Sequence, residues 1–194
     1  PGIAHQDSLL QSKANNYLAV VHPEGDQVGL AFLDVSTGEF MVAQSQVADA
    51  LKWMQTFAPS EVVYNRRERG ATTQQLLGNR TPSSMEDWVF QAAHAQECLQ
   101  KQFDAQSLKG FGLQDAPLGT IAAGVLLHYL AQSKYGATKH IQSVQRLRPA
   151  THLWMDKFTL RNLELFHTPH EGGTALLDIL DQTTSPMGGR WLRR

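Results

Sequence analysis

One aspartate of this 194-residue sequence stands where a nuclease could hold a metal ion. Asp34 lies in residues 30–40, LAFLDVSTGEF, where side chains should alternate between two faces of a strand. A two-metal nuclease needs several carboxylates that converge on ions about 4 Å apart. No spacing forces such convergence on Asp34. The possible companions are Glu39, Glu61, Glu86, Asp87 and Asp115.

A local role for Asp34 explains its position more simply. It precedes Ser36-Thr37-Gly38, where a short carboxylate can accept hydrogen bonds from the backbone N–H groups of a turn. Gly38 can take the positive φ that closes a hairpin. We therefore expect Asp34 to hold a turn. A metal-dependent nuclease that uses Asp34 is the alternative.

The other candidates for chemistry are weaker. Residues 167–171, HTPHE, resemble a zinc motif, but Pro169 interrupts the helical turn that would align the two histidines. Cys98 is the only cysteine, so we expect no disulfide and no thiolate metal cluster. It has no evident histidine partner, and we expect it to pack in the core. The sequence thus predicts no catalytic residue and no metal site.

No phosphate-binding loop occurs in the sequence. Residues 109–112, KGFG, lack the third glycine of a dinucleotide fingerprint, and no G-x-x-x-x-G-K-[ST] is present. We expect no cofactor site in this chain. The basic clusters at 66–69 and 190–194 are interpreted as solvated.

The composition is that of an ordinary globular protein. The chain is 42% apolar and 18% charged, with a net charge of −1, so it creates no strong field for nucleic acid or an anionic membrane. No apolar run reaches the roughly 20 residues of a membrane span. The lone cysteine suits a reducing compartment, and we expect a cytoplasmic protein.

Periodicity predicts an α/β region followed by a helical one. The first region should be a mixed sheet flanked by helices. After 147–149 no further strand beyond 153–155 is evident, so we place the boundary at residue 150, with residues 1–6 as a linker. The expected strands are 17–21, 28–35, 39–43 and 61–64, and residues 82–88 are either irregular or an edge strand. Because helix 47–57 lies between two strands, strand 61–64 is expected to run parallel to part of the sheet. The expected helices are 47–57, a weak one ending at 77, 90–103, a long one capped by Asp115 that includes 121–130, 156–166, 174–180 and 185–194.

Helix 90–103 is expected to present two different faces. An apolar face should pack on the core and is formed by Ala92, Ala95, Leu99 and Phe103. The opposite face is the candidate partner surface. Its members are Gln91, His94, Glu97 and Lys101.

Several segments together resemble the DNA mismatch-repair family MutS. NYLA at 16–19, GLAFLDVSTGEF at 29–40 and PSE at 59–61 are similar to the MutS connector domain, and LKGFG at 108–112 and AAGVLL at 122–127 continue that match. MDKFTLRNLEL at 155–165 is the most specific piece. With LL at 176–177 and LDQTTSPMGGR at 180–190, it resembles the opening of the MutS core or lever domain.

The resemblance implies a role that the residues alone do not show. Residues 1–150 would be a ribonuclease H-like connector without nuclease activity, and 151–194 a truncated start of the lever. The chain would be a non-catalytic middle fragment that couples mismatch binding to an ATPase and offers a MutL-docking surface. In the full-length family, a cytoplasmic dimer binds DNA, with ATP and Mg²⁺ as ligands. The Phe-x-Glu mismatch-reading motif of that family is absent from this sequence.

Overall fold

The computed structural model describes residues 15–133, 138–148, 155, 157–170 and 172–192. These residues form two compact units. The first contains the described residues from 16 to 148 and combines a six-stranded sheet with helices. The described residues of the second unit contain helices as their only regular structure. The predicted fold class, α/β with a mixed sheet flanked by helices and a helical continuation, is confirmed.

The sheet has the strand order β5-β4-β1-β2-β3-β6. β1, β2 and β3 form an antiparallel meander, whereas β4 runs parallel to β1, β5 parallel to β4, and β6 parallel to β3. The parallel pairing of β4 was predicted, and an edge strand was one of the two predictions for residues 82–88, but β6 was not predicted. The strands are β1 (Tyr17–Glu24), β2 (Gln27–Asp34), β3 (Glu39–Gln46), β4 (Glu61–Asn65), β5 (Thr81–Met85) and β6 (Gln145–Arg146).

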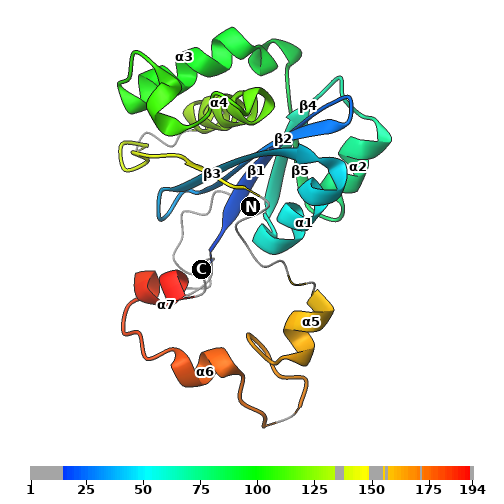
Figure 1. Cartoon of the computed structure of the whole chain (residues 1–194), viewed down its shortest axis with the longest axis vertical. Coiled ribbons are helices and arrows are strands. Elements are labelled where there is room, and N and C mark those ends of the chain that lie inside the picture. The colour runs from blue at the N-terminus through cyan, green and yellow to red at the C-terminus, as the bar shows by residue number, and fades with distance from the viewer. Residues whose placement is uncertain (1–14, 134–137, 149–154, 156, 171, 193–194) are drawn as a thin grey trace. The chain divides into compact units, whose positions relative to one another are not determined.

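Alternating side chains give the sheet two apolar faces. Ala31 and Leu33 of β2 join one buried cluster, and Leu30 and Phe32 join the other, as the strand periodicity predicts. Helices α3 and α4 cover the first face, and α1 and α2 cover the second (Figure 1). The helices are α1 (Val47–Phe57), α2 (Ala71–Leu77), α3 (Ala92–Phe103) and α4 (Pro117–Gln132), with 3₁₀ helices η2 (Asp87–Phe90) and η3 (Leu108–Phe111).

Two glycines let α4 lie directly on the sheet. A Cβ atom on Gly29 of β2 would come within 2.2 Å of the Leu118 carbonyl oxygen, and one on Gly119 would come within 2.8 Å of the Ala43 carbonyl oxygen. This close approach buries α4 on most sides, which explains its nearly continuous apolar sequence.

The start of α4 differs from the prediction. Asp115 does not cap this helix; its carboxylate pairs instead with Arg146 at 3.1 Å. The N–H of Leu118 donates to the Gln44 side chain at 2.9 Å, so a residue of β3 satisfies one free donor of the helix end. Because this cap comes from a distant strand, local sequence could not identify it.

The second unit contains three short helices, α5 (Lys157–Asn162), α6 (Leu176–Leu180) and α7 (Pro186–Leu192). The helices α5 and α6 are shorter than expected from periodicity. The predicted cap Asp156, the possible strand residues 153–154 and the last two residues of the predicted helix 185–194 lie outside the described residues. Large apolar side chains are exposed here, including Phe158 at 73% and Trp191 at 71%. In the part of the chain that the structure describes, no helix is long and apolar enough to span a bilayer.

Candidate functional site

Asp34 closes the loop between β2 and β3. Its side chain is 1% exposed and accepts hydrogen bonds from the Ser36 N–H at 2.8 Å and from the Ser36 hydroxyl at 2.6 Å. The Asn16 N–H also donates to this carboxylate, at 3.3 Å. Gly38 has a φ of 75°, and its N–H donates to the Asp34 carbonyl at 2.9 Å. The predicted structural role of Asp34 is confirmed.

The acidic residues that could have joined Asp34 are bonded elsewhere. Glu39 accepts a hydrogen bond from the Tyr17 hydroxyl at 2.7 Å. Glu86 pairs with Arg66, and Asp87 pairs with Arg67. Among the described residues, no set of carboxylates with Asp34 lies close enough to share an ion. The geometry therefore gives no support to a two-metal nuclease.

Glu61 is the acidic residue buried beneath α4. Its side chain, on a residue that is 4% exposed, accepts hydrogen bonds from the Tyr129 hydroxyl at 2.5 Å and the Ser83 hydroxyl at 2.7 Å. Burial raises the pKa of Tyr129, and the hydrogen bond to Glu61 raises it further. This network ties α4 to β4 and β5. It also provides the hydrogen bonds that these buried polar groups need. Its position favours a structural role over an active site.

The four residues of the candidate partner surface differ in their exposure. Gln91, Glu97 and Lys101 are exposed. On the predicted apolar face Ala95 and Leu99 are buried, but Phe103 is only half-buried and Ala92, in the first turn, is exposed, so the prediction is wrong for Ala92. The helix itself begins at Ala92, after η2. The half-buried His94 turns toward α4, where its Nε2 lies 3.0 Å from His128 Nδ1. Three of the four predicted residues thus remain on an accessible surface.

Cys98 does have histidine neighbours, so that part of the prediction is wrong. Its half-buried Sγ lies 3.5 Å from His94 Nε2. Burial raises the pKa of the Cys98 thiol, and burial followed by the charge of His94 lowers the pKa of His128. The spacing of His94 and Cys98, one helical turn apart, was visible in the sequence. His128 is 30 or more residues away, and only the packing of α4 on α3 brings it to them.

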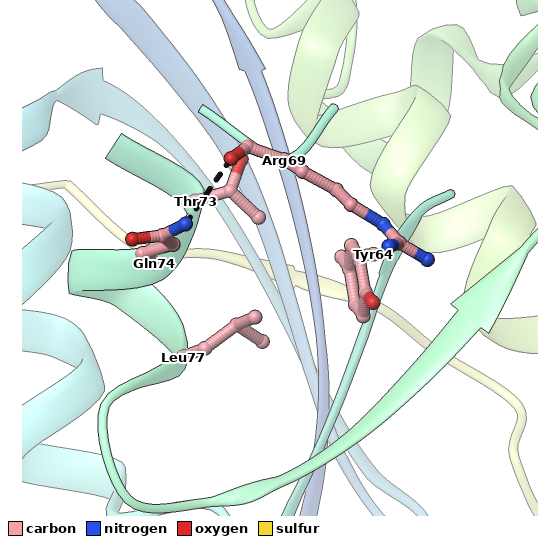
Figure 2. A pocket seen from close by; sticks show the side chains of 5 residues that line it. All are labelled: Tyr64, Arg69, Thr73, Gln74 and Leu77. Atoms are coloured by element: carbon pink, nitrogen blue, oxygen red, sulfur yellow. Dashed lines mark hydrogen bonds between the residues drawn. The ribbon is translucent and has the colours of Figure 1, made fainter. Parts of the chain in front are cut away.

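A small pocket lies on the other face of the sheet, between β4 and α2 (Figure 2). It has a volume of about 220 Å³. Arg69 extends across it toward Tyr64, and the Gln74 side-chain amide donates to the Arg69 carbonyl at 3.4 Å. Thr73 and Leu77 complete the lining. Apart from Arg69, the lining carries no charged side chain, which makes this pocket a poor candidate for a reaction centre.

The histidine motif at residues 167–171 belongs to the second unit. His167 and His170 are exposed, and His170 Nε2 lies 3.6 Å from a Glu164 carboxylate oxygen. Glu171 lies outside the described residues. The interpretation of this segment as a solvated loop fits the described histidines.

Comparison with known proteins identifies the family. Residues 16–142 match the family model described as MutS domain II. The whole chain is similar to curated proteins named DNA mismatch repair protein MutS, with 40% identity to that of Flavobacterium psychrophilum, 40% to that of Christiangramia forsetii and 41% to that of Flavobacterium johnsoniae. Each alignment covers all 194 residues of the chain and 22% of the relative. The chain therefore belongs to the MutS family and contains its connector domain, domain II.

Proposed function

We propose that this chain is a non-catalytic part of a mismatch-repair protein, in which it couples mismatch binding to ATP turnover. The observation that carries the proposal is the similarity of all 194 residues to MutS proteins. Residues 1–150 form the connector, and residues 151–194 begin the lever. ATP, Mg²⁺ and mismatched DNA bind to other parts of the longer protein.

The local bonding of the acidic residues supports a mechanical role. Asp34 holds a turn and Glu61 ties α4 to the sheet, so both carboxylates have structural tasks. The exposed apolar side chains of α5–α7 fit a lever fragment that packs against further segments of a longer protein. A coupling element needs parts that pass a structural change from one to the next, and the chain divides into two compact units.

Loosening the junction of the two units tests this function. In a longer MutS protein that contains this chain, a short Gly/Ser insertion between residues 149 and 150 should leave ATP hydrolysis and mismatch binding individually active. The effect of mismatched DNA on nucleotide affinity should fall toward none, because coupling is a free energy carried between sites. The same insertion beside Gly110, an exposed position with open space around it, is the matched control.

Two results would contradict the coupling role. One is undiminished coupling in the protein with the insertion at the junction. The other is ATP hydrolysis or a preference for mismatched DNA by the isolated 194-residue chain, since the proposal places both activities outside it. Only ATP hydrolysis that co-elutes with the chain in size-exclusion chromatography is evidence against the proposal, because a contaminating ATPase would elute separately.

We also propose that Gln91, which directly precedes α3, and the exposed α3 residues Glu97 and Lys101 form a docking surface for MutL. The family resemblance supplies the partner, and exposure of these side chains supports an accessible surface. Swapping the charges, with Glu97→Lys and Lys101→Glu together, keeps the net charge of the protein unchanged. We expect the affinity for MutL to fall about tenfold, or 1.4 kcal/mol, because charge complementarity is lost.

A second charge swap controls for general effects on the protein. Asp49 and Lys52 form an exposed ion pair on α1, which covers the opposite face of the sheet. Asp49→Lys with Lys52→Asp should leave MutL affinity unchanged, as measured by surface plasmon resonance. Equal affinities for both swapped proteins would remove α3 from the docking surface.

A further inference from the structure

Two helices of the connector bring three metal-binding side chains to one point. His94 and Cys98 lie one turn apart on α3, and His128 faces them from α4. His94 Nε2 lies 3.0 Å from His128 Nδ1 and 3.5 Å from Cys98 Sγ. All three ligand atoms lie within 4.8 Å of one another. All three residues are half-buried, so solvent can reach the cluster.

Two of these separations are close to the edges of a tetrahedral zinc site. Zn–N bonds of about 2.0–2.1 Å and Zn–S bonds of about 2.3 Å place two ligand nitrogens roughly 3.3 Å apart, and a nitrogen and a sulfur roughly 3.6 Å apart. The two short separations in the cluster lie within a few tenths of an ångström of these values. Binding an ion also requires His128 Nδ1 and Cys98 Sγ, which lie within 4.8 Å of each other, to approach to about 3.6 Å.

Hydrogen bonding alone does not explain the cluster well. His94 Nε2 carries either one hydrogen or one lone pair, yet both His128 Nδ1 and Cys98 Sγ lie within reach of it. One neutral nitrogen cannot form a full hydrogen bond with both atoms. A cation among the three atoms would bind each of them through a lone pair, once the thiol proton has left to solvent.

The surroundings of the cluster are those of a metal ligand set. The Gln132 side-chain nitrogen lies 2.9 Å from His128 Nε2, and the opposite orientation of that amide places its oxygen to accept the Nε2–H of a metal-bound His128. The Trp88 ring packs edge-on against both histidines, with centroid distances of 4.9 Å and 5.2 Å. Trp88, which is itself 49% exposed, thus forms an apolar wall on one side of the cluster.

Close packing of α3 on α4 holds His94 and Cys98 next to His128. A Cβ atom on Gly124 would come within 2.3 Å of the Ala95 Cα atom, so α3 and α4 touch backbone to backbone at this point. Ala95 follows His94 in sequence, and His128 lies one turn beyond Gly124. The contact fixes the distance between the ligands of the two helices.

We propose that His94, Cys98 and His128 form a three-ligand site for a divalent transition-metal ion that clamps α3 to α4, with Zn²⁺ the best match. One thiolate and two imidazoles are ligands that zinc accepts and that Mg²⁺ and Ca²⁺ do not favour. A water molecule would complete the tetrahedron. The site is independent of the proposed coupling function, since it concerns ion binding by the connector alone.

Cobalt substitution tests the site directly. Co²⁺ added to the reduced 194-residue chain should bind with a stoichiometry of one ion per monomer and produce the visible bands of a tetrahedral centre. A sulfur-to-cobalt charge-transfer band should accompany them. Because the chain has one cysteine, that band can come only from Cys98. Stoichiometric Zn²⁺ should abolish both sets of bands and raise the melting temperature.

Substitutions of the ligands should remove the signal. Cys98→Ser should abolish the charge-transfer band, and His128→Ala should weaken Zn²⁺ affinity by more than the roughly 10–100-fold typical of an outer-shell change. His140→Ala is the matched control, because His140 Nε2 lies 2.7 Å from the Val35 carbonyl and away from the cluster. It should bind Zn²⁺ like the unaltered chain. Circular dichroism establishes that each variant is folded.

Substitutions of Gln132 can either weaken or strengthen Zn²⁺ binding while all three ligands stay in place. Gln132→Leu should weaken Zn²⁺ binding roughly tenfold or more, and Gln132→Glu should strengthen it, because a carboxylate is a better acceptor for the His128 N–H. A 1:2 complex of ion and chain would overturn the proposal, since Cys98 would then be bridging molecules. Cobalt binding without a charge-transfer band, or equal Zn²⁺ affinity of the His128→Ala variant, would also overturn it.

Discussion

Replacing Gly124 by valine should destabilise the connector by about 3 kcal/mol or more, because overpacking a tight core contact costs this much. Any Cβ atom at position 124 would lie 2.3 Å from the Ala95 Cα atom and 2.5 Å from its carbonyl oxygen. Both are backbone atoms that cannot rotate away, so α3 and α4 must separate. The midpoint of urea unfolding, followed by circular dichroism, measures the loss.

Gly110→Val is the matched control for this substitution. Gly110 is exposed in η3, and a Cβ atom built there meets nothing within 4 Å. We expect its unfolding midpoint to stay close to that of the unaltered chain. If the Gly124 and Gly110 variants unfold at the same urea concentration, the backbone contact between α3 and α4 is not a constraint on the fold.

The second large effect is expected at Asp34. Asp34→Ala should lower the free energy of unfolding by about 2 kcal/mol, because it leaves donors of Ser36 and Asn16 without their buried acceptor. Asp34→Asn should cost less, since its amide oxygen can still accept one of these bonds. Urea unfolding of the three proteins gives the order directly.

Thr37→Ala is the control that distinguishes the effect of losing the Asp34 carboxylate from the effect of altering this loop in general. Thr37 Oγ1 accepts one longer bond, from the Glu39 N–H at 3.3 Å, in the same loop. Loss of this bond should lower the free energy of unfolding by much less than Asp34→Ala does. An Asp34→Ala protein as stable as Thr37→Ala would show that the turn does not depend on this carboxylate.

Local sequence was a good guide to the connector wherever one pattern decided the outcome. Alternation in residues 30–35 predicted which side chains enter each core cluster, and Gly38 marked the hairpin closure. Helix ends were less predictable, because tertiary contacts determine them. Asp115 looked like a cap for α4 but pairs with Arg146, while Gln44 from β3 takes the capping role.

The candidate sites show the same division. The role of Asp34 could be inferred because its partner Ser36 lies two residues away. The cluster at Cys98 could not, because His128 joins it from a different helix. Spacing within one helix can reveal His94 and Cys98, which lie one turn apart on α3. The other half of the site depends on how two helices pack.

The sequence by itself determined the α/β class, the hairpin at Asp34 and the resemblance to MutS, because each rests on short patterns or on residue identity. Only the tertiary structure decided the addition of β6 to the sheet, the burial of Glu61 and the meeting of His94, Cys98 and His128. The physical reason is that these features depend on distances between segments far apart in the chain. For α4, close packing at Gly29, Gly119 and Gly124 sets its distance from the sheet and from α3.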